Sequence, residues 1–183
     1  MAHRKGRAGT VMNAESICFI PMEEKHLPFV CAVYNDYVLH SAATFHIRTQ
    51  DPDGMRPLVI PPDPRYRSYI IARRDTPEGP WLGYACYMPY HPREAYEGTV
   101  SVALYLRPEH TGRGIGRLAL AHLEAEAAKE GFHVLLAHIS GDNTPSLTLF
   151  DRAGYRRCSH YHEIGQKFGR WLDVVAFEKI LNL

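Results

Sequence analysis

The sequence lacks the features that mark several large classes of protein. Its four cysteines, Cys18, Cys31, Cys86 and Cys158, lie far apart and form no C-x-x-C pair, so we expect reduced thiols and not a disulfide framework. No apolar run approaches the roughly 20 residues that a membrane helix needs. The formal net charge is only +1, and the basic residues are spread along the chain. We therefore expect a cytoplasmic protein that binds neither membranes nor nucleic acid.

The remaining composition is that of an ordinary globular domain. Of the 183 residues, 45% are apolar and 22% are charged, and a chain of this length buries most of its apolar surface. There are no internal repeats and no low-complexity tracts. The basic residues near the start are followed by polar residues 13–16 and not by the apolar core of a signal peptide. We expect a loose tail over residues 1–14, with Met12 as an alternative translation start, and one domain over residues 15–183.

The most informative segment is a glycine-rich turn between an apolar run and an amphipathic segment. It reads Thr111-Gly112-Arg113-Gly114-Ile115-Gly116-Arg117. Glycine tolerates tight or positive-φ backbone and lets a ligand approach the amides, and the first turn of a helix offers unpaired N–H groups. The turn is therefore expected to bind an anion such as a pyrophosphate. A P-loop and a dinucleotide fingerprint are both excluded by spacing, because Arg117 stands where either motif needs a different residue.

Hydrophobic periodicity predicts strands that alternate with helices along the chain. The predicted strands cover residues 17–20, 66–72, 81–88, 99–107, 134–139, 155–166 and 172–179, and the predicted helices begin at Pro21 and cover residues 118–129 and 143–152, with one further turn near residues 55–59. The strand at 134–139 is almost continuously apolar, which indicates burial on both faces. This order predicts an α/β (α+β) fold in which a mixed, twisted sheet has helices on both faces.

The glycine turn, x-x-G-x-G between a strand and a helix, resembles the acetyl-CoA pyrophosphate loop of the GNAT acetyltransferase superfamily. Further segments resemble the phosphinothricin and methionine sulfoximine N-acetyltransferase family, and the most specific is Lys-Phe-Gly-Arg-Trp-Leu-Asp-Val at residues 167–174. The others are residues 35–38, 41–45, 95–100, 141–146, 153–155 and 165–166. The resemblance implies the GNAT fold, acetyl-CoA as cosubstrate, direct attack by a small-molecule amine in a ternary complex, and a homodimer with the last hairpin or the 90–97 loop near its interface.

The resemblance also implies which residues bind acetyl-CoA. The amides of the turn hold the pyrophosphate, and two arginines add positive charge; these residues are Thr111, Gly112, Arg113, Gly114, Ile115, Gly116 and Arg117. The backbone of Leu104, Tyr105 and Leu106 pairs with the pantetheine arm, like an added strand, and supplies an oxyanion donor. Asn143 and Ser146 contact the arm from the next helix. Three of these residues have open structural alternatives. Asn143 is also a candidate N-cap of that helix, Ser146 is a candidate surface residue of the helix, and Tyr105 is a candidate packed aromatic residue.

Two positions depart from the family pattern. Ser101 stands where the family carries a glutamate base, and Phe150 stands where it carries a proton donor. We expect His138 or Glu97, acting through ordered water, to replace the missing glutamate base. A histidine pKa of about 6.5 suits a base near neutral pH. A purely structural role for His138 is an equal alternative. A different class of function is also open, namely an acetyl-CoA-binding sensor or interaction module with weak or lost catalysis. The third function that remains open is the same acetyl transfer to a larger acceptor.

The acceptor is expected to be a primary amine of an amino acid or analogue. The residues expected to line its site are aromatic or basic: Tyr34, Phe45, Tyr90, His91, Arg93 and Tyr96. Cys158, His160 and His162 alternate along a predicted strand, so they share one face. That spacing is compatible with zinc, but no fourth ligand is evident and the family needs no metal, so we expect none. Lys167 is expected to be a surface cation, and Trp171 and Asp173 to pack and orient the last hairpin.

Overall fold

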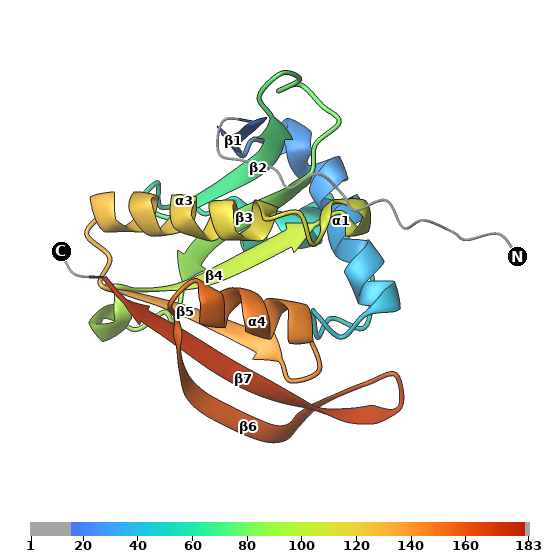
Figure 1. Cartoon of the computed structure of the whole chain (residues 1–183), viewed down its shortest axis with the longest axis vertical. Helices are drawn as coiled ribbons and strands as arrows, with labels where there is room; N and C mark the ends of the chain where they lie inside the picture. Colours follow the sequence, from blue (N-terminus) through green and yellow to red (C-terminus); the bar gives the residue numbers. More distant parts are fainter. Residues whose placement is uncertain (1–15, 182–183) are drawn as a thin grey trace, which may run out of the picture.

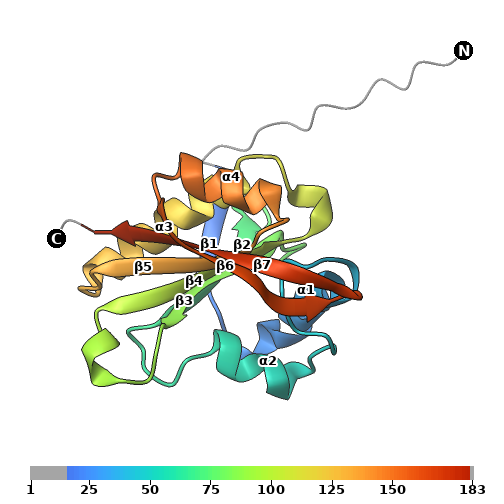
Figure 2. The same ribbon diagram turned by 90° about the horizontal axis from the view of Figure 1, so that it is seen from below.

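A computed structural model describes residues 16–181 as one twisted sheet with helices on both faces (Figures 1 and 2). The elements in chain order are β1 (Ile17–Pro21), α1 (Leu27–His40), α2 (Pro52–Val59), β2 (Arg67–Arg73), β3 (Gly83–Pro89), β4 (Thr99–Leu106), α3 (Ile115–Lys129), β5 (Val134–Ser140), α4 (Thr144–Arg152), β6 (Arg156–Lys167) and β7 (Arg170–Ile180). The predicted tail over residues 1–14 and the start at Met12 lie outside the described residues. Between residues 16 and 181, no helix has the length and apolar character needed to cross a bilayer.

The sheet confirms the predicted mixed α/β topology. Its strand order is β1-β2-β3-β4-β5-β7-β6, and within the described range β4 and β5 form the parallel pair, joined by the crossover helix α3. These two strands pair over three residues, from Thr99 with Val134 to Ser101 with Leu136. Beyond Ser101, β4 continues to Leu106 and β5 continues to Ser140 without pairing to each other. The sheet therefore splits in its middle, at the carboxyl ends of these strands.

The two faces of the sheet bury two separate groups of apolar side chains. Because side chains alternate along a strand, Val100 and Val102 of β4 pack with α3, while Tyr105 packs with α1 and α2. Figure 2 shows α3 and α4 on one side of the sheet and α1 and α2 on the other. Any ligand that enters the split between β4 and β5 therefore meets elements of both layers.

Three of the predicted elements differ from the structure. Pro21 ends β1, paired with Tyr69, and a short 3-10 turn at Glu24–His26 precedes α1, so the prediction of a helix from Pro21 is wrong. The single turn expected near residues 55–59 is the end of the two-turn helix α2, whose N-cap Asp51 accepts a hydrogen bond from the Gly54 N–H. The third difference is β5, which is not buried on both faces: His138 is exposed because the split leaves part of this strand without a neighbour.

Lys167 is buried, and the prediction that it is a surface cation is wrong. Its side chain is 4% exposed, and Nζ donates hydrogen bonds to the carbonyl oxygens of Ser41 at 2.7 Å and Thr44 at 2.8 Å. The Tyr37 carbonyl lies at 3.5 Å. The ammonium therefore satisfies carbonyl groups at the end of α1 and in the loop that follows it, where the negative end of the helix dipole favours a cation. Trp171, which was expected to pack, is 59% exposed.

Candidate active site

A cleft opens where β4 and β5 separate. It consists of two adjoining hollows, of about 440 Å³ and about 260 Å³. The larger is bordered by the glycine turn and α4, and the smaller reaches through the split to His138 on β5. The residues that border both hollows are Tyr37, Leu104, Thr111, Pro145, Ser146 and Leu149. The cleft is thus one continuous passage from the α3 and α4 layer toward the α1 layer.

The glycine turn has the backbone geometry that its sequence predicts. Gly112 and Gly114 have φ angles of 71° and 82°, in the left-handed region that only glycine adopts readily, and Gly114 is the N-cap of α3. The first helical hydrogen bond of α3 runs from the Leu118 N–H to the Gly114 carbonyl. The N–H groups before Leu118 consequently have no intrahelical acceptor and can bind an anion.

The turn residues differ in how they meet the cleft. The larger hollow is bordered by Thr111, Gly112, Gly114, Gly116 and Arg117. Ile115 is fully buried in the core and borders neither hollow. Arg113 borders neither hollow. The positive side chain on the cleft wall is therefore Arg117, with Arg152 of α4 on the same wall.

Gly116 allows α3 to approach β4 and α4 closely. A Cβ at this position would lie 2.9 Å from Leu149 Cδ2 and 3.3 Å from Leu104 Cδ2, and the residue itself borders the larger hollow. We predict that Gly116→Val weakens acetyl-CoA binding by about tenfold or more, equivalent to about 1.4 kcal/mol, because the new methyl groups occupy the passage. Calorimetric titration with acetyl-CoA measures this.

Gly98→Ala is the matched control for that substitution. A Cβ at Gly98 would meet no atom closer than 3.9 Å, so this variant should bind acetyl-CoA as the parent does. An unchanged dissociation constant in a correctly folded Gly116→Val protein would contradict the placement of the cosubstrate in this hollow.

The remaining residues predicted to bind the cosubstrate lie along β4 and at the start of α4. Leu104 and Leu106 border the larger hollow, and Tyr105 borders the smaller. The Tyr105 ring packs between other tyrosines, with the Tyr84 ring centroid at 5.3 Å, and burial raises the pKa of its hydroxyl. Tyr105 is therefore a packed aromatic residue, which is one of the two readings that the sequence left open.

Asn143 caps α4 and also lies at the cleft. Its Oδ1 accepts a hydrogen bond from the Ser146 N–H at 3.2 Å, which makes it the N-cap of α4. Asn143 also borders the smaller hollow, and Ser146 borders both. The cap fixes the start of α4 against the cleft, so both side chains are available to a ligand there.

His138 is the titratable group that the fold brings to the split. The register of Ser101 with Leu136 places the His138 side chain on the same face of the sheet as Ser101. Although part of the ring faces solvent, the cleft wall desolvates it, and this desolvation lowers the pKa of His138 below its usual value. No residue among 16–181 forms a hydrogen bond with this imidazole, and its lowered pKa keeps the ring mostly neutral near pH 7.

The other two candidate bases do not border the cleft. Ser101 is half-buried at the last residue pair before the split and borders neither hollow. Glu97 is exposed and follows the short 3-10 turn Glu94–Tyr96, two residues before β4 begins. Glu97 therefore lies outside β4 and does not share the regular side-chain alternation of that strand with Ser101. Phe150 borders the smaller hollow at the place of the missing proton donor.

Three of the six residues predicted for the acceptor side form one aromatic group beside His138. The Tyr90 ring lies parallel to the His138 ring with centroids 6.3 Å apart, and Tyr96 lies 5.5 Å from Tyr90 and 5.1 Å from His91. Arg93 is exposed, and its backbone N–H donates to His91 Nδ1 at 3.2 Å. This group lies beside the His138 imidazole, and none of its members borders either hollow.

Tyr34 and Phe45, the other two residues predicted for the acceptor side, also border neither hollow. Tyr34 is buried, and its hydroxyl is bonded to Thr44 Oγ1 at 2.5 Å and to His46 Nδ1 at 2.7 Å. Phe45 packs on Gly165 so closely that a Cβ there would lie 2.4 Å from its ring. Both residues thus stabilise the loop after α1, and neither lines the cleft.

Tyr37 is a polar cleft residue that was not among the predicted site residues. It borders both hollows, and its hydroxyl donates a hydrogen bond to the Leu106 carbonyl at 2.6 Å. Burial raises the pKa of this hydroxyl, so it keeps its proton at neutral pH. Its helical spacing with other apolar residues of α1 predicts a core side chain, and nothing in the local sequence distinguishes it from one.

Comparison with known proteins identifies relatives along most of the chain. A model of the acetyltransferase (GNAT) family matches residues 28–155. The chain is 36% identical to phosphinothricin N-acetyltransferase of Streptomyces coelicolor over 163 residues, which cover 88% of this chain and 94% of that protein. It is 35% identical to an L-methionine sulfoximine/L-methionine sulfone acetyltransferase of Pseudomonas aeruginosa, with 86% and 89% covered.

A solved structure has the same fold and contains the cosubstrate. It is a GNAT-superfamily phosphinothricin acetyltransferase from Sinorhizobium meliloti in complex with acetyl-CoA, with a TM-score of 0.84 and 25% identity; the match covers 91% of this chain and 89% of that one. The split sheet, the glycine turn at the start of α3 and the family match together lead to one conclusion: the chain belongs to the GNAT acetyltransferase family and is an acetyl-CoA-dependent N-acetyltransferase.

Proposed function

We propose that this protein transfers the acetyl group of acetyl-CoA to the primary amine of a small amino acid or amino-acid analogue. Two relatives at 35–36% identity are named for acetylation of phosphinothricin and of methionine sulfoximine or sulfone, which supports this acceptor class. The observation that carries the proposal is the continuous passage with an anion-binding turn at one end and a neutral histidine at the other. Direct attack of the amine on the bound thioester suits this arrangement, because it holds both reactants together.

In this proposal the α3 and α4 side of the passage binds the cosubstrate. The turn amides and Arg117 take the pyrophosphate, and Asn143 and Ser146 contact the pantetheine arm. The backbone of Leu104 to Leu106 lies beyond the last β4–β5 pair, so apart from the Leu106 carbonyl, which accepts from Tyr37, its groups on the β5 side would pair with the arm and with the developing oxyanion.

The α1 side of the passage is proposed to bind the acceptor and to remove its proton. His138, through ordered water, takes a proton from the ammonium, and Tyr90, His91 and Tyr96 provide a wall for the acceptor side chain. Glu97 is a weaker candidate for the base because it lies outside the cleft. The leaving thiolate has a conjugate-acid pKa near about 8.5, so it departs with little help from an acid.

We also infer that two copies associate through the last hairpin. Large hydrophobic side chains are exposed on β6, on β7 and in the turn between them, with Tyr161 at 42%, Ile164 at 58%, Phe168 at 56% and Trp171 at 59%. Such a patch favours an interface. The mass in solution by light scattering tests this, with a single-chain mass as the contradicting result. The proposed compartment is the cytoplasm, whose reducing conditions suit the four free cysteines.

The first experiment is thiol release from acetyl-CoA with methionine sulfoximine, phosphinothricin and the free amino acids as acceptors. We expect turnover above roughly 1 s⁻¹ with at least one of them, an ordinary rate for an enzyme. The absence of histidine or tyrosine at position 150 and of glutamate at position 101 favours a second candidate, an acetyl-CoA sensor with weak catalysis. Tight acetyl-CoA binding without turnover on any acceptor would favour that candidate and contradict the proposal.

A further inference from the structure

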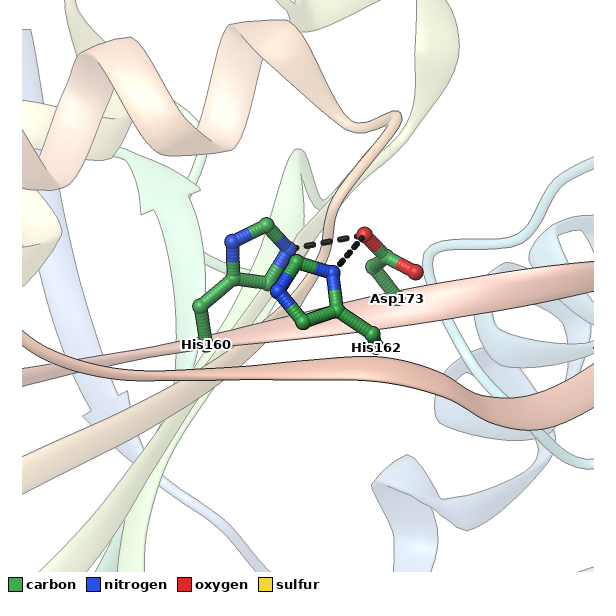
Figure 3. A group of neighbouring side chains, drawn as sticks. All are labelled: His160, His162 and Asp173. Atoms are coloured by element: carbon green, nitrogen blue, oxygen red, sulfur yellow. Dashed lines mark hydrogen bonds and ion pairs between the residues drawn. The ribbon is translucent and has the colours of Figure 1, made fainter.

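Three side chains with metal-ligating atoms meet on the last hairpin, away from the acetyl-transfer cleft. They are His160 and His162 of β6 and Asp173 of β7 (Figure 3). His160 Nε2 lies 2.7 Å and His162 Nδ1 lies 3.3 Å from Asp173 Oδ2, and all three ligand atoms lie within 4.8 Å of one another. The two imidazole ring centroids are 4.0 Å apart. The cluster thus presents two nitrogens and one oxygen toward a common point.

A bulge in β6 produces this arrangement. Tyr161 pairs with Val174 and Gly165 pairs with Leu172, so the three residues 162–164 stand opposite Asp173 alone. Within the bulge Glu163 has a φ of 51°, in the left-handed region that is costly for any residue other than glycine. Strained backbone of this kind persists where surrounding contacts determine it, and it often marks a functional site. A second bulge, between Arg157 and Ser159, removes Cys158 from the expected row of side chains.

A backbone hydrogen bond fixes the orientation of the Asp173 carboxylate. Asp173 Oδ1 accepts a hydrogen bond from the Glu163 N–H at 2.8 Å, which leaves Oδ2 facing the imidazoles. Metal sites use such supporting hydrogen bonds to orient a ligand.

We propose that His160 Nε2, His162 Nδ1 and Asp173 Oδ2 bind one Zn²⁺ ion per chain. Two imidazoles and a carboxylate form a donor set that zinc uses when it keeps a fourth position open. Ligands at 2.0–2.2 Å in a tetrahedron lie about 3.4 Å apart, so the ion requires only small shifts from the present separations. For the ion to bind, each imidazole would carry its proton on the ring nitrogen that faces away from Oδ2, so that the nitrogen facing Oδ2 offers its lone pair.

The fourth position has room for water. His160 and Asp173 border a hollow of about 330 Å³ between the hairpin, α4 and the end of β5, and the rest of its walls is formed by Gly141, Leu147, Arg157, Ser159 and Val175. The ion would therefore join β6 to β7 across the bulge while one face remains open to solvent. The expected role is to fix the hairpin, because an ion that binds only the folded state stabilises it.

Zinc titration of the untagged, metal-free full chain by calorimetry tests the site. We expect one Zn²⁺ per chain with a dissociation constant on the order of 1 µM, and a rise in the unfolding midpoint of about 5 °C at 100-fold excess over that constant. Co²⁺ in place of Zn²⁺ should give the intense visible bands of a tetrahedral complex. These readouts do not depend on acetyl transfer, so the proposal stands apart from the proposed function.

Single His160→Gln and His162→Gln variants should each weaken zinc binding by tenfold or more. His162 is 73% exposed, so its replacement leaves the fold intact. Asp173→Asn keeps an oxygen for the Glu163 N–H but loses the charge, and it should weaken binding as strongly. The matched control is His40→Gln, since His40 pairs with Asp36 at 3.1 Å on the surface of α1 but has no third ligand beside it. Binding in this control should be unchanged.

Three results would overturn the proposal. They are no binding by the parent chain, equal binding by the His160→Gln/His162→Gln double variant, and a stoichiometry of one ion per two chains. The last result would place the ion between copies, and light scattering with and without zinc would reveal it as a change of mass.

Discussion

Replacing His138 with glutamine is expected to lower kcat roughly 10²- to 10⁴-fold, the usual loss when a general base is removed. Glutamine keeps a similar size and a hydrogen-bonding end, so the wall of the cleft beside Tyr90 stays filled. Acetyl-CoA binding should change little, because the cosubstrate is placed against the turn and α4. Thiol release at saturating substrates, together with calorimetric titration of acetyl-CoA, separates these two effects.

The pH profile gives a readout that a merely structural histidine would not change. Burial lowers the pKa of His138 from its usual value near 6.5, and only the neutral ring accepts a proton. The parent's kcat/KM should therefore rise with pH through an inflection below pH 6.5, and this inflection should vanish in the glutamine variant.

His133→Gln is the control for a histidine that lies outside the cleft, one residue before β5. An unchanged pH profile in His138→Gln would remove this residue from the mechanism. A large loss in Glu97→Gln instead would transfer the role to that carboxylate.

Replacing Lys167 with methionine is expected to lower the free energy of unfolding by about 3 kcal/mol. Methionine has nearly the same length, but it leaves the carbonyls of Ser41 and Thr44 buried without their donor. Each unsatisfied buried polar group costs about 1–3 kcal/mol, and the helix end also loses its cation. Chemical denaturation, followed by circular dichroism, measures the difference.

Arg170→Met is the matched control on the same hairpin. Arg170 is 55% exposed and pairs with Asp142 at the surface, so its loss should cost no more than about 1 kcal/mol. Equal losses in both variants would show that the three backbone contacts of Lys167 contribute nothing specific.

The denaturation series also has a predicted pH dependence. Burial lowers the pKa of Lys167 in the native state, so the unfolded chain binds this proton more tightly. Between the lowered native pKa and about 10.5, the stability of the parent should therefore rise with pH relative to Lys167→Met.

Local patterns predict the sheet, α3 and the glycine turn well, because each depends on features a few residues apart. The x-x-G-x-G spacing requires positive φ at Gly112 and Gly114, and the structure has it at both. The cap of α4 by Asn143 follows in the same way from one residue and its neighbours. Such features depend on backbone preference and need no knowledge of the rest of the chain.

Features that depend on distant segments were predicted less well. The partners of Lys167 lie more than 120 residues away in sequence, so its burial has no local signal. Tyr37 reaches β4 from α1 by a contact of the same kind, 69 residues apart. The prediction that Cys158, His160 and His162 share one face assumed regular side-chain alternation along β6, which the bulges of this strand interrupt. Asp173 joins the two histidines from the neighbouring strand β7. Alternation predicts faces only while the register is unbroken.

The burial of Lys167 has a consequence for a protein that works in the presence of a reactive thioester. Lysine amines react with acyl donors only when they are deprotonated and accessible, and a lowered pKa would make this amine the more reactive if it were accessible. At 4% exposure it is shielded, so acylation has to wait until the hairpin separates from the end of α1. The rate at which Lys167 becomes acetylated would therefore report how often the hairpin opens locally.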